Sequence, residues 1–243
     1  MSWPEGWVVR HVTETGSTNE DLVAAVGAGA VGDRTVLVAD HQTAGRGRLD
    51  RRWDAPPGAN LLVSIAISPV PEVAAEATHR TGLAAVAACR RFVQAGVVGE
   101  VGLKWPNDVL IGGRKLAGIL AQRVPGRDAV VVGIGVNVTW APGGATSLAD
   151  HAPGPVSPAR VLDALLDELD ALPAEVATVY RESLVTVGQQ VRVELPGQAP
   201  TLHGRAVDVD AEGRLLVVDD AGELHVLDVG DVVHVRAGTP DPA

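Results

Sequence analysis

Apolar residues along most of the chain come in short runs that predict an alternation of strands and helices. Continuous β-branched and apolar runs are typical of strands buried in a sheet, and they lie at residues 7–13, 35–40, 60–67, 101–104, 109–111, 116–124 and 129–138. Apolar residues at helical spacing predict helices over residues 17–28, 71–95 and 159–184. Pro173 is expected to divide the last of these helices, and Ser17 with Glu20 matches a capping box at the start of the first.

The pattern changes after residue 186. Five short alternating runs separated by turn residues lie between Gly188 and Arg236. Runs this short and evenly spaced predict a small antiparallel barrel. We therefore expect two domains, residues 1–186 and 187–243, with a frayed tail from Ala237.

Composition places this chain among globular proteins of the cytoplasm. It has 243 residues, of which 46% are apolar. No apolar run reaches the roughly 18–20 residues that a membrane helix needs, and the N-terminus lacks the basic-then-apolar plan of a secretory signal. The single cysteine, Cys89, excludes an internal disulfide framework and a cysteine-based zinc site.

Charge is distributed unevenly along the chain. The net charge of −10 argues against nucleic-acid binding over the whole surface. Four arginines nevertheless fall within seven positions of a glycine-containing loop: Arg46, Arg48, Arg51 and Arg52. Such a loop can bind phosphate or carboxylate groups bidentately, although a solvated arginine-rich loop is the alternative. A dinucleotide fingerprint is excluded, because Asp50 stands at the third glycine position and Pro56-Pro57 prevents a helix.

Both lysines of the chain, Lys104 and Lys115, lie in one segment, residues 102–120. Gly112-Gly113 predicts a hairpin there, and an antiparallel arrangement could turn both ammonium groups toward one cleft. Asp108 could neutralise a lysine or hold Mg²⁺ through oxygen. A surface hairpin with solvated charges is the alternative interpretation.

Two further segments have the composition of ligand sites. Ser17 and Thr18 lie in the run GSTN and could equally act as helix caps. The run GIGVN, residues 133–137, places glycines inside a strand, which often marks close backbone approach to a ligand. Asn137, if buried, needs hydrogen-bond partners, which an adenine or a small polar ligand could supply.

Together, these motifs resemble those of the bacterial biotin–protein ligases. The runs GSTN, QTAGRGR…W, KWPND…KxAG and GIGVN occur in that order between residues 16 and 137. The C-terminal barrel agrees with the SH3-like end domain of that family. One position departs from the pattern, because Asp50 stands where the family's loop usually carries glycine.

The resemblance implies an α+β fold, with a mixed-sheet catalytic domain of the class II synthetase type followed by the SH3-like barrel. It implies ATP-dependent activation of biotin to biotinyl-5′-AMP, with Mg²⁺, and transfer of biotin to a lysine of the biotin carboxyl carrier domain of an acyl-CoA carboxylase. The catalytic pattern begins within about ten residues of Met1, so we expect a form without the DNA-binding module. We also expect no nucleic-acid or membrane partner, and a monomer or weak homodimer.

The resemblance also assigns residues. Those expected at biotin are Ser17, Thr18, Asn19, Gln42, Gly45, Arg46, Lys115 and Gly118. Those expected at ATP or the adenylate are Arg48, Arg51, Trp53, Asn107, Lys115 and Asn137. The catalytic set is Lys115, Arg46, Arg48 and Lys104, and Asp108 is the expected Mg²⁺ contact.

Three alternatives stay open at this point. A lipoate–protein ligase would share the catalytic fold and the adenylation chemistry. A biotin-sensing regulator would require a DNA-binding module and a basic face. A ligand-binding protein without turnover would not need both lysines and three loop arginines.

Overall fold

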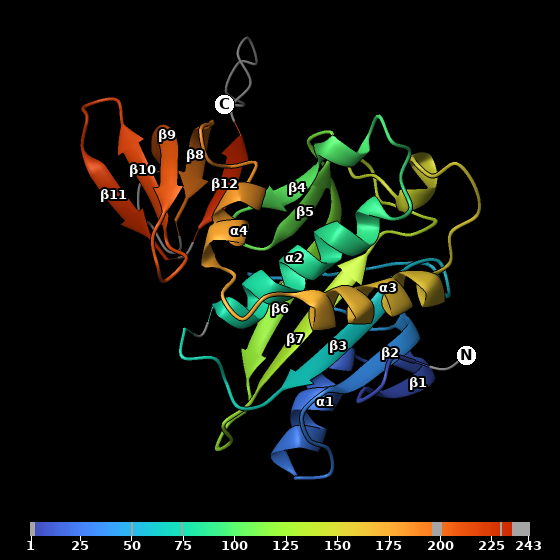
Figure 1. Cartoon of the computed structure of the whole chain (residues 1–243). Coiled ribbons are helices and arrows are strands. Elements are labelled where there is room, and N and C mark those ends of the chain that lie inside the picture. The colour runs from blue at the N-terminus through green and yellow to red at the C-terminus, as the bar shows by residue number, and fades with distance from the viewer. Residues whose placement is uncertain (1–2, 50, 74, 196–200, 229, 235–243) are drawn as a thin grey trace.

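The fold is described from a computed structural model, which covers residues 3–49, 51–73, 75–195, 201–228 and 230–234. The tail expected to fray from Ala237 lies outside the described residues, and so does Asp50. Two sheets and the helices that cover them make up the molecule (Figure 1).

The larger sheet has seven strands in the order β1-β2-β3-β7-β6-β5-β4. The strands are β1 (Val8–Thr15), β2 (Thr35–Gln42), β3 (Leu61–Ile67), β4 (Val101–Lys104), β5 (Asp108–Ile111), β6 (Arg114–Arg123) and β7 (Val130–Val136). The β1–β2 pair is parallel and the other neighbours are antiparallel, so the sheet is mixed as expected. The predicted hairpin at Gly112-Gly113 joins β5 to β6, and both glycines adopt positive φ.

Helices cover both faces of this sheet. The alternation of side chains along the strands shows which helices lie on which face. The helices are α1 (Thr18–Gly27), α2 (Glu76–Arg90), α3 (Pro158–Ala171) and α4 (Ala177–Ser183), with short 3₁₀ turns at Val98–Glu100 and Leu148–Asp150. Val130 and Val132 of β7 belong to the core beneath α2 and α3, whereas Val131 packs with Leu22 of α1. Because successive side chains of a strand point to opposite faces, Gly133 and Gly135 lie on the α1 face.

Two helix predictions need correction. Helix α2 is shorter than residues 71–95: it spans Glu76–Arg90, and it ends in a turn where the N–H groups of Arg91 and Phe92 donate to the Ala88 and Cys89 carbonyls. The capping box at α1 does not form: Ser17 is the N-cap residue but its side chain makes no capping hydrogen bond, and the Glu20 carboxylate pairs with Arg46 instead. The division at Pro173 is confirmed, since α3 and α4 lie on either side of it.

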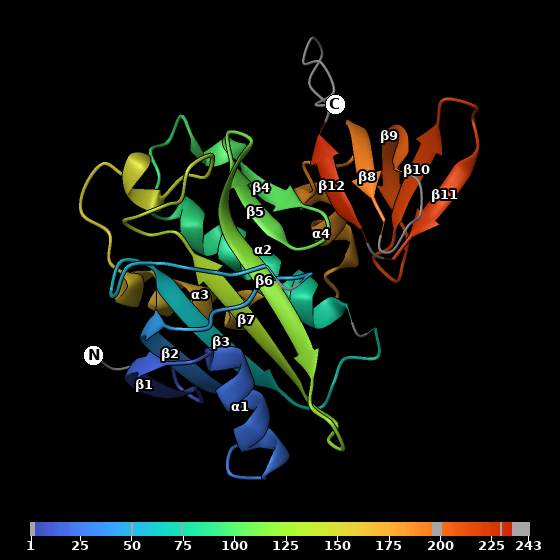
Figure 2. The ribbon, with the colours of Figure 1, turned by 180° about the vertical axis from the view of Figure 1, so that it is seen from behind.

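The smaller sheet confirms the five-strand prediction. Its order is β11-β10-β9-β8-β12, entirely antiparallel, with strands β8 (Gln190–Glu194), β9 (Leu202–Val209), β10 (Leu215–Asp219), β11 (Leu224–Leu227) and β12 (Asp231–His234). Strand β12 faces the seven-stranded sheet and β11 lies farthest from it (Figure 2). The domain boundary at residues 186 and 187 stays a prediction.

Several contacts join the smaller sheet, and the segment that leads into it, to the rest of the molecule. The Trp105 indole donates from Nε1 to the Gly213 carbonyl at 2.9 Å, and the Val185 N–H donates to the Leu103 carbonyl at 2.8 Å. Arg181 of α4 pairs with Asp208 of β9. One hydrophobic cluster includes buried residues of both sheets.

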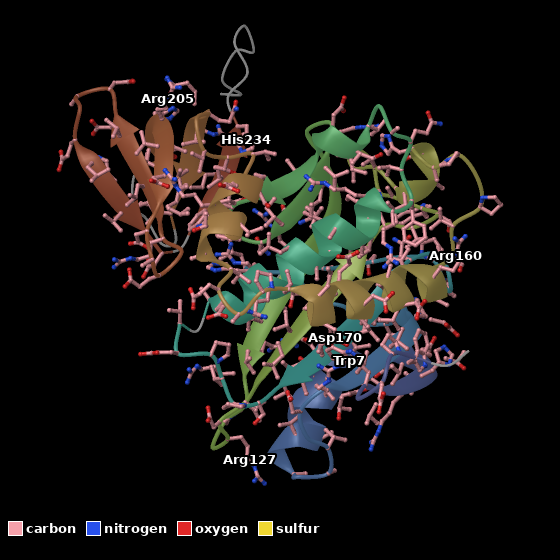
Figure 3. All side chains as sticks on the ribbon, viewed as in Figure 1. Trp7, Arg127, Arg160, Asp170, Arg205 and His234 are labelled. Atoms are coloured by element: carbon pink, nitrogen blue, oxygen red, sulfur yellow. The ribbon has the colours of Figure 1, made fainter. Side chains whose placement is uncertain are left out.

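A polar cluster of Trp7, Arg34 and Asp170 connects the N-terminal edge of the larger sheet to α3. Trp7 donates from Nε1 to the Asp170 carboxylate at 2.9 Å, and Figure 3 labels this pair. Arg34 stacks over the Trp7 ring and also pairs with Asp170. Among the described residues, no helix has the length and apolar character to cross a membrane.

A buried histidine packs where α2 meets the smaller sheet. His79 stacks on Tyr180 with ring centroids 3.7 Å apart, and a Cβ on Gly213 would come within 2.3 Å of the imidazole. Only 8% of His79 is exposed, and burial lowers its pKa to about 4. The histidine is therefore neutral in the folded protein near neutral pH.

This burial predicts an acid-sensitive fold. Between pH 6.5 and pH 4 the unfolded chain binds a proton at His79 that the folded chain does not, so stability falls as the pH falls. The loss amounts to about 3 kcal/mol at pH 4. His79→Phe keeps an aromatic ring and removes the titration. Urea unfolding at several pH values should show the natural protein losing that much more stability than the variant, and parallel curves would contradict the assignment.

Candidate functional site

A cavity of about 260 Å³ lies on the α1 face of the larger sheet. Its walls include most of the residues singled out from the sequence: Ser17, Thr18, Asn19, Gln42, Arg46, Arg48, Arg51, Trp53, Asn107, Asp108, Lys115, Gly118 and Asn137. Gly45 and Lys104 do not line it. Four segments that are separate in the sequence therefore meet at one place.

A relay of buried hydrogen bonds forms one end of the cavity. Gln42 accepts at Oε1 from the Thr18 N–H at 2.8 Å. The single hydroxyl proton of Thr18 is donated either to Gln42 Oε1, 3.0 Å away, or to the Ser64 oxygen. The Thr18 and Ser64 hydroxyl oxygens are 2.8 Å apart, and Ser64 donates to Asn19 Oδ1 at 2.9 Å. Asn19 in turn donates from Nδ2 to the Leu120 carbonyl and to Gln122.

This relay fixes the orientation of two amide side chains. Because both described hydrogen bonds of Gln42 use Oε1, its Nε2 is the polar atom left to donate to a ligand. Thr18, Asn19 and Ser64 are at most 5% exposed, so their polar groups are shielded from water. Fully satisfied buried networks of this kind are rigid, and this end of the cavity is suited to a small polar ligand.

Glycines on two neighbouring strands make the floor of the cavity. Gly118 of β6 and Gly135 of β7 are cross-strand partners. The Trp53 indole lies on this pair: a Cβ on Gly135 would come within 2.4 Å of the ring, and one on Gly118 within 3.0 Å. A Cβ on Gly133 would come within 2.6 Å of Asn19 Oδ1. Protein side chains, Trp53 and Asn19, make the close approach to this strand, and the approach of a ligand stays a prediction.

Trp53 ends the arginine loop, residues 43–49 and 51–53, which crosses in front of β6 and β7 in Figure 2. Its indole N–H is buried and has no hydrogen-bond partner among the described residues. The Lys115 ammonium lies 5.6 Å from the ring centroid, within the range of a cation–π contact. A buried unpaired donor costs free energy, so the indole is a natural partner for an acceptor on a ligand.

Each arginine of the loop has a protein partner. The Arg46 guanidinium lies 2.9 Å from Glu20 Oε1, and Arg52 lies 3.0 Å from Asp54 Oδ1. Arg51 pairs with Asp231 of the smaller sheet. Arg48 donates to Asn107 and to the Gly230 carbonyl, each at 3.4 Å. Burial lowers the pKa of Arg48, and the carboxylates of Asp108 and Asp231 oppose that effect.

The two lysines do not share the cavity as expected. The Lys115 ammonium lines it and lies 2.6 Å from Asp108 Oδ1, whereas Lys104, although paired in register with Asp108, is outside the lining. The β5–β6 register shifts between Val109 and Leu110, and Lys115 reaches the face of Gly118, where a Cβ would lie 3.2 Å from its ammonium nitrogen. Of the two lysines, only Lys115 lines the cavity, so the expected shared cleft is not found.

Asn137 is 2% exposed, and protein groups already engage its amide. Its Nδ2 donates to the Thr146 carbonyl at 3.1 Å and to the Lys115 carbonyl at 3.4 Å, and its Oδ1 accepts from Asn60 at 3.2 Å. The side chain can therefore offer a ligand only the second lone pair of Oδ1. Its main effect here is to bind the backbone at Lys115 to the loop at Thr146.

Sequence reasoning missed Ser64, Asn60 and Asp231. Ser64 had a signal, since it is the one hydroxyl inside the apolar run NLLVSIAI. Asn60 precedes the same run and is one of four asparagines in the chain. Asp231 had no signal, because its partner Arg51 lies 180 positions away.

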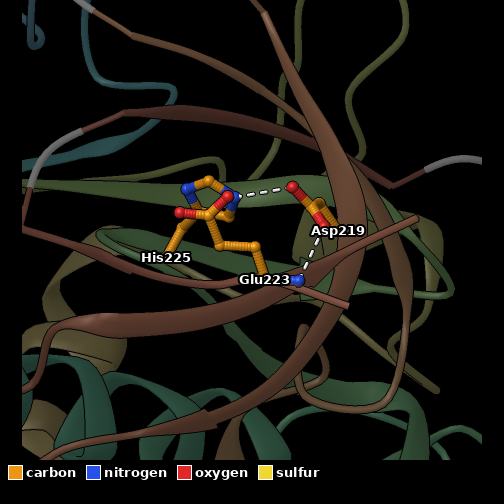
Figure 4. A group of neighbouring side chains, drawn as sticks. All are labelled: Asp219, Glu223 and His225. Carbon is orange, nitrogen blue, oxygen red and sulfur yellow. Dashed lines mark hydrogen bonds and ion pairs between the residues drawn. The ribbon is translucent and has the colours of Figure 1, made fainter. Parts of the chain in front are cut away.

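The cationic end of the cavity, where Arg46, Arg48, Arg51 and Lys115 line the wall, also has a carboxylate that suits one magnesium ion. Mg²⁺ is bound by one or two carboxylates with phosphate oxygens and waters, and Asp108 lines the cavity beside Lys115. A second acidic cluster, Asp219, Glu223 and His225, lies at the β10–β11 turn (Figure 4). There Asp219 accepts from the backbone N–H groups of Ala221 and Glu223 and pairs with the His225 ring, so turn formation accounts for it.

Comparison with known proteins identifies the class to which this fold and site belong. Residues 14–138 match the biotin/lipoate A/B protein ligase family, and residues 186–235 match the biotin protein ligase C terminal domain. A biotin–[acetyl-CoA-carboxylase] ligase of Mycobacterium tuberculosis is 43% identical over 93% of this chain and 88% of that protein. The chain belongs to the biotin protein ligases of this family.

Two other relatives extend the comparison. The bifunctional ligase/repressor BirA of Bacillus subtilis is 32% identical, over 75% of this chain and 61% of that protein. The structure of the biotin protein ligase from Aquifex aeolicus in complex with biotin and ATP superposes with a TM-score of 0.78 at 26% identity, covering 95% of this chain and 99% of that one. The expected α+β fold, with its two characteristic units, is confirmed.

The glycine floor predicts a sharp double-mutant result. Gly135→Ala places a methyl group against the Trp53 ring, and such overpacking costs about 1–3 kcal/mol. Urea unfolding should show this loss. Combining it with Trp53→Ala should recover most of it, because the ring that the methyl group meets is gone. Gly143→Ala is the control, since its Cβ would meet nothing within 4 Å. Additive losses in the double variant would show that the indole does not rest on Gly135.

Proposed function

We propose that this protein activates biotin with ATP to biotinyl-5′-AMP and then transfers biotin to a lysine of a carrier protein. The observation that carries the proposal is one cavity with two chemically different ends, a satisfied polar relay at one and clustered cations at the other. Biotin has a polar ring system at one end and a carboxylate at the other. The cavity matches that polarity along its length.

The neutral end binds the biotin head group. Gln42 donates from its free amide, held in place by Thr18, while Ser17 and Asn19 complete the wall. Gly118 lies close to biotin, where its missing side chain leaves room for Trp53 and Lys115, and Gly45 keeps the arginine loop close, since a Cβ there would come within 2.4 Å of the Trp53 carbonyl. The biotin carboxylate then extends toward Lys115 and Arg46.

The cationic end binds ATP. Lys115, Arg46 and Arg48 hold the carboxylate and α-phosphate oxygens, while Arg51 and Asn107 lie at the outer phosphates. Trp53 packs on adenine, and Asn137 accepts through its remaining lone pair. Asp108 is the residue that would contact Mg²⁺, which neutralises phosphate charge when bound with ATP. Lys104 acts from outside the cavity wall, through its charge.

In the first step, a biotin carboxylate oxygen attacks the α-phosphorus, and the bond to pyrophosphate breaks. In the second, the ε-amine of a carrier lysine attacks the carbonyl carbon of the mixed anhydride, releases AMP and loses a proton. Arginine stays protonated, so the loop arginines act by charge and position. Positive groups fixed where negative charge develops are a large source of rate enhancement.

The carrier is the biotin carboxyl carrier domain of an acyl-CoA carboxylase, and the reaction takes place in the cytoplasm. Two findings support biotin over lipoate: the match to the biotin protein ligase C terminal domain and the identity to the mycobacterial relative. We expect neither a nucleic-acid partner nor an assembly larger than a weak homodimer.

Incubation with ATP, Mg²⁺, biotin and a carrier domain tests the proposal. Intact mass should show one biotin added to the carrier, and lipoate in a parallel reaction should give far less product. A carrier in which the target lysine is replaced by arginine is the control. Modification by lipoate but not by biotin would refute the assignment.

Replacement of Lys115 by arginine tests the cationic end. A single ammonium can approach a compact oxygen cluster from any direction, whereas a planar guanidinium on a longer stem displaces the ligand or Gly118. Loss of one well-placed donor costs on the order of 10²–10³ in rate. Single-turnover adenylate formation measures the effect, and the melting temperature should not change. Arg114→Lys, on the same strand and exposed, is the charge-preserving control. Activity within about threefold of that of the natural protein corresponds to only about 0.65 kcal/mol, and it would mean that Lys115 is a solvated surface residue.

A further inference from the structure

Residues of the smaller sheet form part of the cavity wall. Gly230 and Asp231, at the start of β12, line the cavity together with the arginine loop. Asp231 forms an ion pair with Arg51, and the Gly230 carbonyl accepts from Arg48 at 3.4 Å. Two consecutive positions of the C-terminal unit thus hold two of the loop's arginines.

Asp231 differs in its surroundings from other acidic residues of the smaller sheet. Burial would raise its pKa, but the hydrogen bond and charge of Arg51, together with Lys104 and Lys115, outweigh that effect and lower it. Asp208 pairs instead with Arg181 of α4, and Asp219 with a neighbouring turn. Asp231 lines the cavity and pairs with Arg51, whereas Glu194 of β8 raises the pKa of Arg51 through its charge.

The arrangement of charges around Arg51 and Asp231 suits the binding of a phosphate group. With no anion bound, cations crowded in a cavity repel one another, and a carboxylate among them relieves that repulsion. The Arg51 side chain is 62% exposed and that of Asp231 is 28% exposed. Ion pairs this exposed are weak. A polyphosphate with several negative charges can therefore displace the carboxylate from Arg51.

We propose that Asp231 is an internal counter-ion that occupies the position of a phosphate group. In the nucleotide-free protein it pairs with Arg51 and holds the arginine loop against β12. When the polyphosphate of ATP binds, Arg51 transfers from Asp231 to phosphate, and the link between the loop and the C-terminal unit is released. This inference rests on the proposed function for the identity of the anion, and it makes Asp231 a positioning residue.

Asp231→Asn tests the tether in the free protein. The substitution keeps the size of the side chain and removes its charge. Trypsin cleaves after arginine, so the rate of nicking within the loop reports how often the loop leaves β12. We expect nicking about two- to fivefold faster in the variant, the factor that corresponds to one exposed ion pair. Asp220→Asn, at the exposed β10–β11 turn, is the matched control and should nick like the natural protein.

Equilibrium binding tests the counter-ion role. Inorganic tripolyphosphate and a non-hydrolysable ATP analogue, the latter with biotin present, should each bind Asp231→Asn about two- to fivefold more tightly, because no carboxylate has to be displaced. Once either anion is bound, both proteins should be nicked at the same rate. Melting curves of both variants show whether folding is retained.

Two outcomes would overturn the inference. Weaker binding of the analogue by Asp231→Asn, with a changed Mg²⁺ dependence, would make the carboxylate a metal contact. Equal nicking and equal affinities would make the pair an incidental surface contact. Failure of the proposed function has a different signature: tripolyphosphate would still bind more tightly to the variant, but the analogue would bind to neither protein.

Discussion

The site depends on glycines placed where two neighbouring strands meet. On the α1 face of β6 and β7, Gly118, Gly133 and Gly135 carry no side chain, whereas the opposite face of β7 presents Val132 and Ile134 to the core. Side chains at those three positions would meet Trp53 or Asn19 at or below van der Waals contact. The missing side chains leave room for the indole, for the buried amide of Asn19 and for the cavity beside them.

Rigidity at the neutral end follows from that close approach. Asn19 reaches the backbone of β6 because Gly133 leaves space, and Ser64 of β3 then links Asn19 to Thr18. A buried polar group without a partner costs free energy, so each member of the relay determines the orientation of the next. Gln42 is held at the end of the relay with one amide group available, which is the preorganisation that selective binding of a polar ring requires.

The cationic end is organised differently, because charge rather than packing holds it. Lys115 pairs with Asp108, Arg46 with Glu20 and Arg51 with Asp231. Most of these side chains are partly exposed, so each pair is weak and exchangeable. Because the cations of this site are paired with the protein's own carboxylates, they can exchange those pairs for a highly charged ligand. The carboxylates can pair with them again when a less charged product is released. The partners come from three places in the fold: the hairpin of the sheet, helix α1 and the smaller sheet.

The sequence by itself determined the local structure and the four motifs. Apolar periodicity located the strands and helices, Pro173 divided the last helix, and the Gly112-Gly113 turn joined β5 to β6, because these features depend on neighbouring residues. Family resemblance supplied the cavity residues, of which Gly45 and Lys104 proved to lie outside the wall. Only the tertiary structure decided which distant groups meet. Among the described residues, the Ser17 side chain makes no capping hydrogen bond. Asn137 forms hydrogen bonds with Asn60 and Thr146, and Asp231 pairs with Arg51, which lies 180 positions away. The physical reason is that ion pairs and buried hydrogen bonds form between groups that folding brings together, and the spacing of residues along the chain carries no record of them.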